Sequence, residues 1–453
     1  MAIGGGRQGD GERRGRLTGL IAAVGFVLWR ARSIGTRPVV FPDSSSYRHS
    51  AASHTALVSL VGHAPRDVLV PAFFALLGSD QARVYGQWAV STLSWLVLAY
   101  ALAVSLRSVP ARVVGVAGVL ALGGVPQTWN WDFTLLSESL STSLAVLVLA
   151  AALRTAAAPS RWHEVSLGTV LVLWVAARVD VGPAVLVAAV ALGVLAARRR
   201  QWSAAMVPAV ALLAVAWGGW TTTRLDASFQ KASSTGLSYS QELFAYELHE
   251  RVLTTPAALA YFRSHGMPAC PGVTTSAAAA TASRLFFARF RHCRPLRGWA
   301  TKSGRSTLLS FVVSHPPDYL RWLSHDTGRL ATGAIYVPEV RSDWRVLSTL
   351  FYGGRWLSPL ADLAVLLAAG LLAALAVRPR QPGAAVTVTA LVNAVAALVG
   401  LLAGQLLSAG EVERSTVPEG TLLRLAPILL VAAAVDHLRA HSPRRSPRGH
   451  SDC

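Results

Sequence analysis

Long runs of apolar residues are the feature that most constrains what this chain can fold into. Such runs occupy Leu144–Leu153, Ala184–Ala197 and Leu363–Val377. With their weakly polar flanks they approach the roughly 18 to 20 residues that a helix needs to cross a bilayer. Hydrophobic residues make up 53% of the 453 residues and charged residues 14%, about half the charged share of an average soluble domain. The composition excludes a soluble enzyme, a disordered chain and a small disulfide-stapled domain, and it predicts an all-α polytopic membrane protein.

The apolar segments predict about ten transmembrane helices with both termini in the cytoplasm. The predicted spans are 17–29, 84–106, 113–128, 135–153, 165–178, 183–197, 203–221, 356–377, 383–408 and 419–438. When the N-terminus is placed inside, every cytoplasmic loop carries arginine, as in the triplet Arg198–Arg200 and in the C-terminal tail. An excess of Lys and Arg in short loops marks the cytoplasmic side, so this pattern sets the orientation.

This topology has five parts. They are a cytoplasmic N-terminus (1–16), a first transmembrane block (17–221) with an outer loop at 32–83, a polar extracytoplasmic segment (222–355), a C-terminal transmembrane block (356–438) and a basic cytoplasmic tail (439–453). The extracytoplasmic segment contains helix-like stretches, and we expect it to be largely helical. It also holds Cys270 and Cys293. An oxidising outer compartment permits a disulfide between them, although their spacing alone does not establish the pairing.

The net charge of +19 does not by itself indicate a nucleic-acid partner. Lys231 and Lys302 are the only lysines, and much of the arginine lies in short loops, where it fixes topology. The chain contains no nucleic-acid-binding motif and no zinc-type spacing of Cys and His. We therefore expect the lipid bilayer, and not nucleic acid, as a partner. The bias toward Arg, Ala, Val, Leu and Gly indicates a bacterial source.

Several carboxylates lie close to the predicted outer ends of the spans. Asp43 follows the first span, Asp132 lies between aromatic residues, and Glu138 begins the fourth span. A carboxylate at membrane depth costs about 2.5–3.5 kcal/mol on insertion scales, so it usually faces a cavity or a partner. Each also has a structural explanation. Asp43 would cap a helix, and Asp132 would belong to an aromatic loop at the membrane interface. Glu138 would interact favourably with the positive end of the helix dipole. The sequence leaves both interpretations open.

Several motifs resemble those of GT-C glycosyltransferases, which are polytopic enzymes that take sugars from polyprenyl-phosphate donors. The stretch Pro42–Tyr47 has a Pro-Asp-Ser-x-x-Tyr pattern directly after the first span, and Leu135–Leu140 is similar to the Ser-Glu-Ser-Leu signature at the start of a later span. Further similar stretches are Arg251–Pro256, Arg263–Pro268, Ser314–Leu320 and Glu411–Arg414. The resemblance rests on their order and on their predicted placement at the outer face.

The resemblance implies roles for two carboxylates. In this superfamily an acid of the first outer loop acts as general base on the acceptor hydroxyl or helps to hold a divalent metal, and Asp43 occupies the matching position. Many relatives have two adjacent acids there, whereas here serines follow Asp43. We therefore expect a lone catalytic base and name no metal ligand, while a divalent metal stays open as a cofactor. Glu138 would orient the acceptor or the sugar.

Substrate contacts are expected from polar groups beside these carboxylates. Tyr47 belongs to the same element as Asp43, and Asp132 lies in the neighbouring aromatic loop. The leaving group of a polyprenyl-phosphate sugar is a phosphate, which arginine binds through two parallel hydrogen bonds. The candidates near the outer face are Arg30, Arg32, Arg178 and Arg414, of which we select the last two. Each could instead be an interfacial arginine whose head group reaches the membrane surface.

These features predict a GT-C-like hexosyl- or pentosyltransferase of the bacterial plasma membrane. It would transfer a sugar from a polyprenyl-phosphate donor to a cell-envelope glycan or lipid acceptor at the outer face, with Asp43 as the base. The lack of a Walker or G-x-G-x-x-G element fits a lipid-linked donor better than a nucleotide. Two alternatives stay open. One is a transporter or flippase of lipid-linked glycans, in which intramembrane charge is equally natural. The other is a non-catalytic envelope scaffold.

Overall fold

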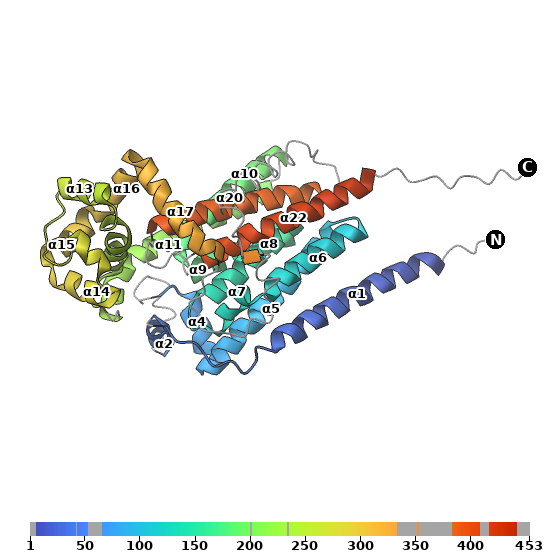
Figure 1. Ribbon diagram of the computed structural model, residues 1–453. Helices are drawn as coiled ribbons and strands as arrows, with labels where there is room; N and C mark the ends of the chain where they lie inside the picture. Colours follow the sequence, from blue (N-terminus) through green and yellow to red (C-terminus); the bar gives the residue numbers. More distant parts are fainter. Residues whose placement is uncertain are drawn as a thin grey trace, which may run out of the picture.

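We describe the fold from a computed structural model of the chain. In the part that it describes, all regular elements are helices, apart from one isolated β-bridge between Val39 and Thr134. The described residues are 6–41, 43–52, 66–199, 202–232, 235–332, 351–352, 383–407 and 416–441. They form an elongated helical bundle with a smaller helical lobe at one end (Figure 1). The all-α fold that the sequence predicts is therefore confirmed.

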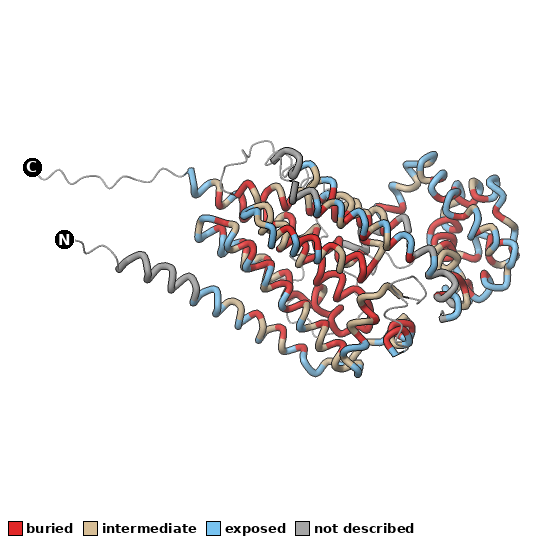
Figure 2. Tube along the Cα trace, turned by 180° about the vertical axis from the view of Figure 1, so that it is seen from behind, coloured by how far each residue is buried: buried red, intermediate tan, exposed pale blue. Residues whose placement is uncertain are grey.

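Helix α8 lies at the centre of the bundle. The long helices are α1 (Gly6–Ala31), α5 (Asp80–Ser105), α6 (Val109–Gly124), α8 (Glu138–Ala157), α9 (Arg161–Ala177), α10 (Gly182–Arg199), α11 (Trp202–Ala232), α20 (Ala384–Leu407) and α22 (Val417–His441). Helix α8 packs against α5, α9, α20 and α22, and Figure 2 shows the buried residues gathered in the interior of the bundle. A helix buried on all sides has no polar outer face. The sequence of α8 fits this position, because it consists mainly of Ala, Leu, Val, Ser and Thr.

Short elements connect these helices at the end of the bundle that carries the lobe. They are α2 (Ser44–Ala52), α4 (Leu69–Leu77), α7 (Pro126–Trp129) and two 3-10 turns, η1 (Asn130–Phe133) and η2 (Val179–Val181). Serine caps fix the starts of α5, α6 and α9, since the hydroxyls of Ser79, Ser108 and Ser160 each accept a backbone N–H three residues on.

The lengths of the helices support a membrane architecture. Four described helices are long and apolar enough to cross a bilayer, namely α5, α8, α20 and α22. A fifth span results if α6 and the bent segment Pro126–Phe133, at 61° to it, count as one. Shorter apolar helices cover Leu17–Ala31, Val179–Val194 and Met206–Thr221. Helices overlap the other predicted spans, and the span 356–377 lies outside the described residues. Ten crossings and the orientation of the termini stay predictions, because four or five described spans meet the length and apolarity that a crossing needs.

The end of the bundle opposite the lobe is tied together by a buried carboxylate. Helix α1 begins and α22 ends at this end (Figure 1). Asp436, in the last turns of α22, accepts hydrogen bonds from the backbone N–H groups of Arg107 at 3.1 Å and Ser108 at 2.6 Å. These N–H groups precede the first turn of α6, where a negative charge is favourable. Asp436 therefore fixes the α5–α6 turn against α22.

The lobe has a hydrophobic core of its own. Its elements are α12 (Tyr239–Glu247), the π-helical η3 (Leu248–Val252), α13 (Pro256–Ser264), η4 (Ser276–Ala280), α14 (Ser283–His292), α15 (Arg294–Trp299), the π-helical η5 (Ala300–Gly304), α16 (Arg305–Ser314) and α17 (Pro316–Thr332). The core is rich in aromatic residues such as Phe262, Phe290 and Phe311, and it is separate from the core of the bundle. The described part of the predicted extracytoplasmic segment thus contains a compact helical unit.

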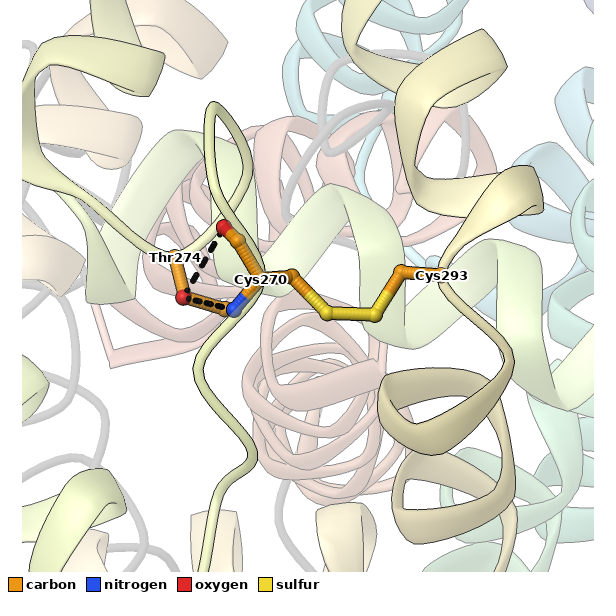
Figure 3. The surroundings of a disulfide bond; sticks show 3 residues. All are labelled: Cys270, Thr274 and Cys293. Carbon is orange, nitrogen blue, oxygen red and sulfur yellow. Dashed lines mark hydrogen bonds between the residues drawn. A yellow bond between two sulfur atoms is a disulfide. The ribbon is translucent and has the colours of Figure 1, made fainter.

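A disulfide closes this unit. Cys270, before η4, is bonded to Cys293, between α14 and α15 (Figure 3). The Cα–Cα distance of 6.4 Å lies inside the range of disulfides. Thr274 fixes the loop beside it, because its hydroxyl accepts the Cys270 N–H at 2.8 Å. The bond therefore joins the start of α15 to the loop that precedes η4.

Loss of this disulfide should destabilise the lobe. For two cysteines 23 residues apart, the chain-entropy relation gives roughly 3 kcal/mol. We expect the Cys270→Ser/Cys293→Ser variant of the full chain to unfold at a lower temperature in detergent, as measured by tryptophan fluorescence. Cys453→Ser is the control and should leave the transition unchanged. A double variant as stable as the wild type would contradict the pairing.

Candidate functional site

A short backbone bridge brings the first outer loop beside the start of α8. The Val39 N–H donates to the Phe133 carbonyl at 2.7 Å, and the Leu135 N–H donates to the Val39 carbonyl at 3.2 Å. Asp43 and Glu138 each follow this bridge by a few residues in their own segments. The two carboxylates that the sequence selects as catalytic therefore lie at the same end of the bundle, next to the lobe.

Asp43 forms an ion pair with Arg66, which is not among the arginines predicted to bind phosphate. The Arg66 guanidinium lies 3.0 Å from the Asp43 carboxylate, and its Nε donates to the Ser46 hydroxyl at 2.6 Å. It also lies over the ring of Tyr47, 4.7 Å from the centroid. The carboxylate of Asp43 keeps 26% of its exposure. Asp43 is thus held by a cation and remains accessible, while the buried Tyr47 supports Arg66.

Asp67 connects this pair to the junction between α9 and α10. The Val179 N–H donates to the Asp67 carboxyl at 3.2 Å. Burial is the main cause that raises the pKa of Asp67 to about 7, and the nearby Asp180 carboxylate raises it further. Because Asp67 follows Arg66 directly and Val179 follows Arg178, this hydrogen bond places the two arginines in one region.

Arg178 holds two carboxylates at the same junction. Its guanidinium makes a two-pronged ion pair with Asp180 and lies 3.9 Å from the Glu138 carboxylate. Glu138, in the first turn of α8, is 2% exposed. A buried carboxylate needs a cation or hydrogen bonds to offset the loss of water. Arg178 supplies this cation, which explains how α8 can carry the buried carboxylate of Glu138 in its first turn.

A further acid comes from the first turn of α22. Glu419 is buried and interacts electrostatically with Arg178 and Asp180. Gly400 of α20 makes room for it, since a Cβ at this position would lie 2.8 Å from Glu419 Cγ. Tyr239 lies at the start of α12. Burial is the main cause that raises the pKa of its phenol, and the nearby Asp180 carboxylate raises this pKa further. The lobe therefore contributes to the same region.

We call these residues the charged cluster, and it combines acidic groups with two guanidiniums. Its members are Asp43, Arg66, Asp67, Glu138, Arg178, Asp180 and Glu419. Chemically it offers carboxylates that accept hydrogen bonds from hydroxyl groups and arginines that bind phosphate or carboxylate. Within the described residues, no three His, Cys, Asp or Glu side chains are arranged to hold a metal ion.

Asp132 belongs to a neighbouring network. It is 1% exposed and forms an ion pair with Arg30 of α1. The Ser139 hydroxyl donates to its Oδ1 at 2.6 Å, and Gln87 of α5 donates to its backbone carbonyl at 3.0 Å. The flanking Trp131 is buried as well, not presented to a membrane surface. These contacts tie α1 and α5 to the start of α8, and the substrate contact of Asp132 stays a prediction.

The structure brings Asp43, Tyr47, Glu138 and Arg178 into one region, as a common site requires. Arg414, the other predicted phosphate partner, lies outside the described residues. Arg66, Asp67, Glu419 and Tyr239 also contribute to this region, although no motif of the sequence selects them. The adjacent Arg66 and Asp67 in the outer loop, and Glu419 at the start of the last span, were the signals that could have indicated them.

Replacing Asp67 should change the pH dependence of stability. Its pKa in the unfolded chain is roughly 3.9, so at intermediate pH the folded protein binds a proton that the unfolded chain has lost. The stability due to neutral Asp67 is fully present below the unfolded pKa and is lost as pH rises through the folded value of about 7. We expect the stability of the Asp67→Asn variant to fall less steeply as pH rises. At about pH 8 the variant should have a higher melting temperature than the wild type. The control Asp318→Asn should keep the wild-type slope. An unchanged profile in Asp67→Asn would contradict the burial of this carboxyl.

Removing one partner of the Arg30–Asp132 pair should destabilise the protein more than removing both partners. Arg30→Met leaves a buried carboxylate without its cation, which typically costs about 3–5 kcal/mol. The double variant Arg30→Met/Asp132→Asn removes both charges and should recover most of that loss. Equilibrium unfolding in mixed detergent micelles measures the three free energies. Equal destabilisation by the single and double variants would contradict an ion pair that acts as a unit.

The comparisons with known proteins identify no relative. No family model, no curated protein and no solved structure matches this chain.

Proposed function

We propose that this chain is a GT-C-like glycosyltransferase. It transfers a hexosyl or pentosyl group from a polyprenyl-phosphate donor to a cell-envelope glycan or lipid acceptor. The protein resides in the bacterial plasma membrane with about ten spans and both termini cytoplasmic. The charged cluster then faces the extracytoplasmic side. Helix α1 starts and α22 ends at the same end of the bundle (Figure 1). This arrangement supports an even number of membrane crossings.

The observation that carries the proposal is the partly exposed Asp43 carboxylate beside Arg66, in the same region as Arg178 and Glu138. Glycosyl transfer from a lipid phosphate needs a base that the acceptor can reach and a cation for the departing phosphate. Asp43 is 26% exposed, whereas Glu138 is buried. This difference supports Asp43 as the base and Glu138 as a residue that positions Arg178.

The reaction follows from these roles. The Asp43 carboxylate takes the proton of the acceptor hydroxyl while the hydroxyl oxygen attacks the anomeric carbon. The bond from that carbon to the phosphate oxygen breaks, and polyprenyl phosphate leaves with the bonding electron pair. Arg66 and Arg178 are the guanidiniums of the cluster that can neutralise the phosphate. Asp180, whose side chain is 30% exposed, can accept hydrogen bonds from sugar hydroxyls.

The placement of charge also distinguishes this proposal from a transporter. A transporter commonly binds its cargo near the middle of the membrane, at broken helices. Here Glu138 and Glu419 lie in first turns of their helices, and Asp436 lies in the last turns of α22. Charge at helix ends supports a site that opens at the membrane surface.

A transfer assay tests the proposal. Purified protein in nanodiscs receives radiolabelled polyprenyl-phosphate sugars and envelope-glycan acceptors. We expect transfer by the wild type and a loss of roughly 10²–10⁴-fold in Asp43→Asn, the usual contribution of a general base. Asp80→Asn is the matched control, because Asp80 is also paired with arginine at this end of the bundle but lies outside the charged cluster. It should retain transfer.

Each other outcome has a definite meaning. Full transfer by Asp43→Asn would contradict Asp43 as the base. Translocation of intact lipid-linked glycan across liposomes, without transfer, would favour the flippase. Cells that tolerate Asp43→Asn and Arg178→Gln without loss of function would favour a scaffold.

A further inference from the structure

The lobe carries an excess of basic residues that the charged cluster does not use. Residues 235–332 contain eleven Arg and Lys residues but five Asp and Glu residues. No acid occurs between Ser283 and Arg305, although this segment holds seven Arg and Lys residues. Membrane-insertion topology does not account for this excess, because the charge rule applies to short cytoplasmic loops and not to large outer segments.

The basic side chains of this segment are directed to solvent. The exposed ones, which we call the basic surface, are Arg289, Arg291, Arg294, Lys302 and Arg305. Among the described residues none of them is paired with a carboxylate. Arg321 of the same lobe differs, since it forms a 2.9 Å ion pair with Asp318. The basic surface therefore retains positive charge that the described part of the protein does not neutralise.

The basic surface rests on a rigid support. In α14 the apolar side chains of Phe286 and Phe290 are buried in the core of the lobe, and the exposed Arg289 and Arg291 flank this buried face on its two sides. The disulfide at Cys293 fixes the junction between α14 and α15 (Figure 3). Cations held in fixed positions lose less entropy when they bind a charged ligand than cations on a mobile loop.

The position of α15 identifies the kind of partner. Figure 1 shows α15 at the edge of the lobe farthest from the bundle. A surface that served to hold lipid head groups would lie close to the membrane-crossing helices. Arg294 of the basic surface lies in α15 and so on the far side of the lobe, where it would meet polymers outside the membrane. Arginine, which predominates here, forms paired hydrogen bonds with carboxylate and phosphate groups.

We propose that the basic surface binds a linear anionic glycan outside the membrane. Several exposed cations in one short segment match a polymer with regularly spaced negative groups, and the attraction is screened by salt. The identification of this glycan as the acceptor rests on the glycosyl transfer proposed above. Binding itself does not depend on transfer.

A binding measurement without donor tests the proposal. The full chain, in nanodiscs of zwitterionic lipid, is titrated with a fluorescent oligogalacturonate and, separately, with a neutral dextran of the same length. The variant Arg289→Gln/Arg294→Gln/Arg305→Gln removes three charges from the basic surface. Arg161→Gln/Arg263→Gln/Arg321→Gln removes three exposed charges elsewhere and is the matched control.

We expect the wild type to bind oligogalacturonate in a salt-dependent manner and to ignore dextran. The first variant should bind roughly tenfold more weakly, and the control variant should bind as the wild type does. Equal weakening in both variants would assign the binding to net charge alone and overturn the proposal. So would unchanged binding by the first variant. Flotation with phosphatidylglycerol vesicles that needs the basic surface, without oligogalacturonate binding, would assign the surface to the membrane instead. None of these results depends on whether transfer occurs.

Discussion

A guanidinium buried at the end of a helical bundle must have carboxylates around it, and the architecture of this end follows from that requirement. Removing a charge from water is expensive unless a partner offsets the loss. Arg178 meets Asp180 and Glu138, and Arg30 meets Asp132. These pairs join α1 to η1, and α8 to the α9–α10 junction, so the same contacts that make burial tolerable also bring the charged groups together.

The two buried arginines serve different purposes. Arg30 lies in a network that includes Ser139 and Gln87 and that holds the turn before α8 in place. Arg178 lies in a region with surplus carboxylates and with an accessible acid, Asp43, nearby. In the network of Arg30 the charges are balanced, which stabilises the packing of the helices around it. The region of Arg178 leaves acceptors for further hydrogen bonds, which is what a polar ligand requires.

The fold was largely predictable because hydrophobic runs of membrane length allow few alternatives to helices. Predicted spans such as 84–106 and 383–408 coincide with α5 and α20 within a few residues. The predicted span 113–128 missed the 61° bend between α6 and Pro126–Phe133. The break lies at the extended Val125, directly before Pro126, and a residue before proline disfavours the helical conformation. The sequence also did not indicate the core of the lobe, since aromatic residues scattered between Phe244 and Trp322 come together only in the folded unit.

The candidate site was predictable in part. Asp43, Tyr47, Glu138 and Arg178 stood out because each is polar beside a predicted span. Asp67 and Glu419 were missed because their roles depend on partners distant in sequence, namely Val179 and Arg178. The internal ion pair of Asp132 was missed for the same reason. Its partner Arg30 is 102 residues away in sequence, and no local pattern distinguishes an internal ion pair from a ligand contact.

The central claim is that the charged cluster receives the phosphate and sugar of a lipid-linked donor. The most direct measurement is a cryo-EM structure of the Asp43→Asn protein in nanodiscs with a polyprenyl-phosphate sugar bound. The account predicts density for the phosphate against Arg66 or Arg178 and the anomeric carbon close to residue 43. Donor density in the middle of the bundle, or on the lobe away from the cluster, would contradict it.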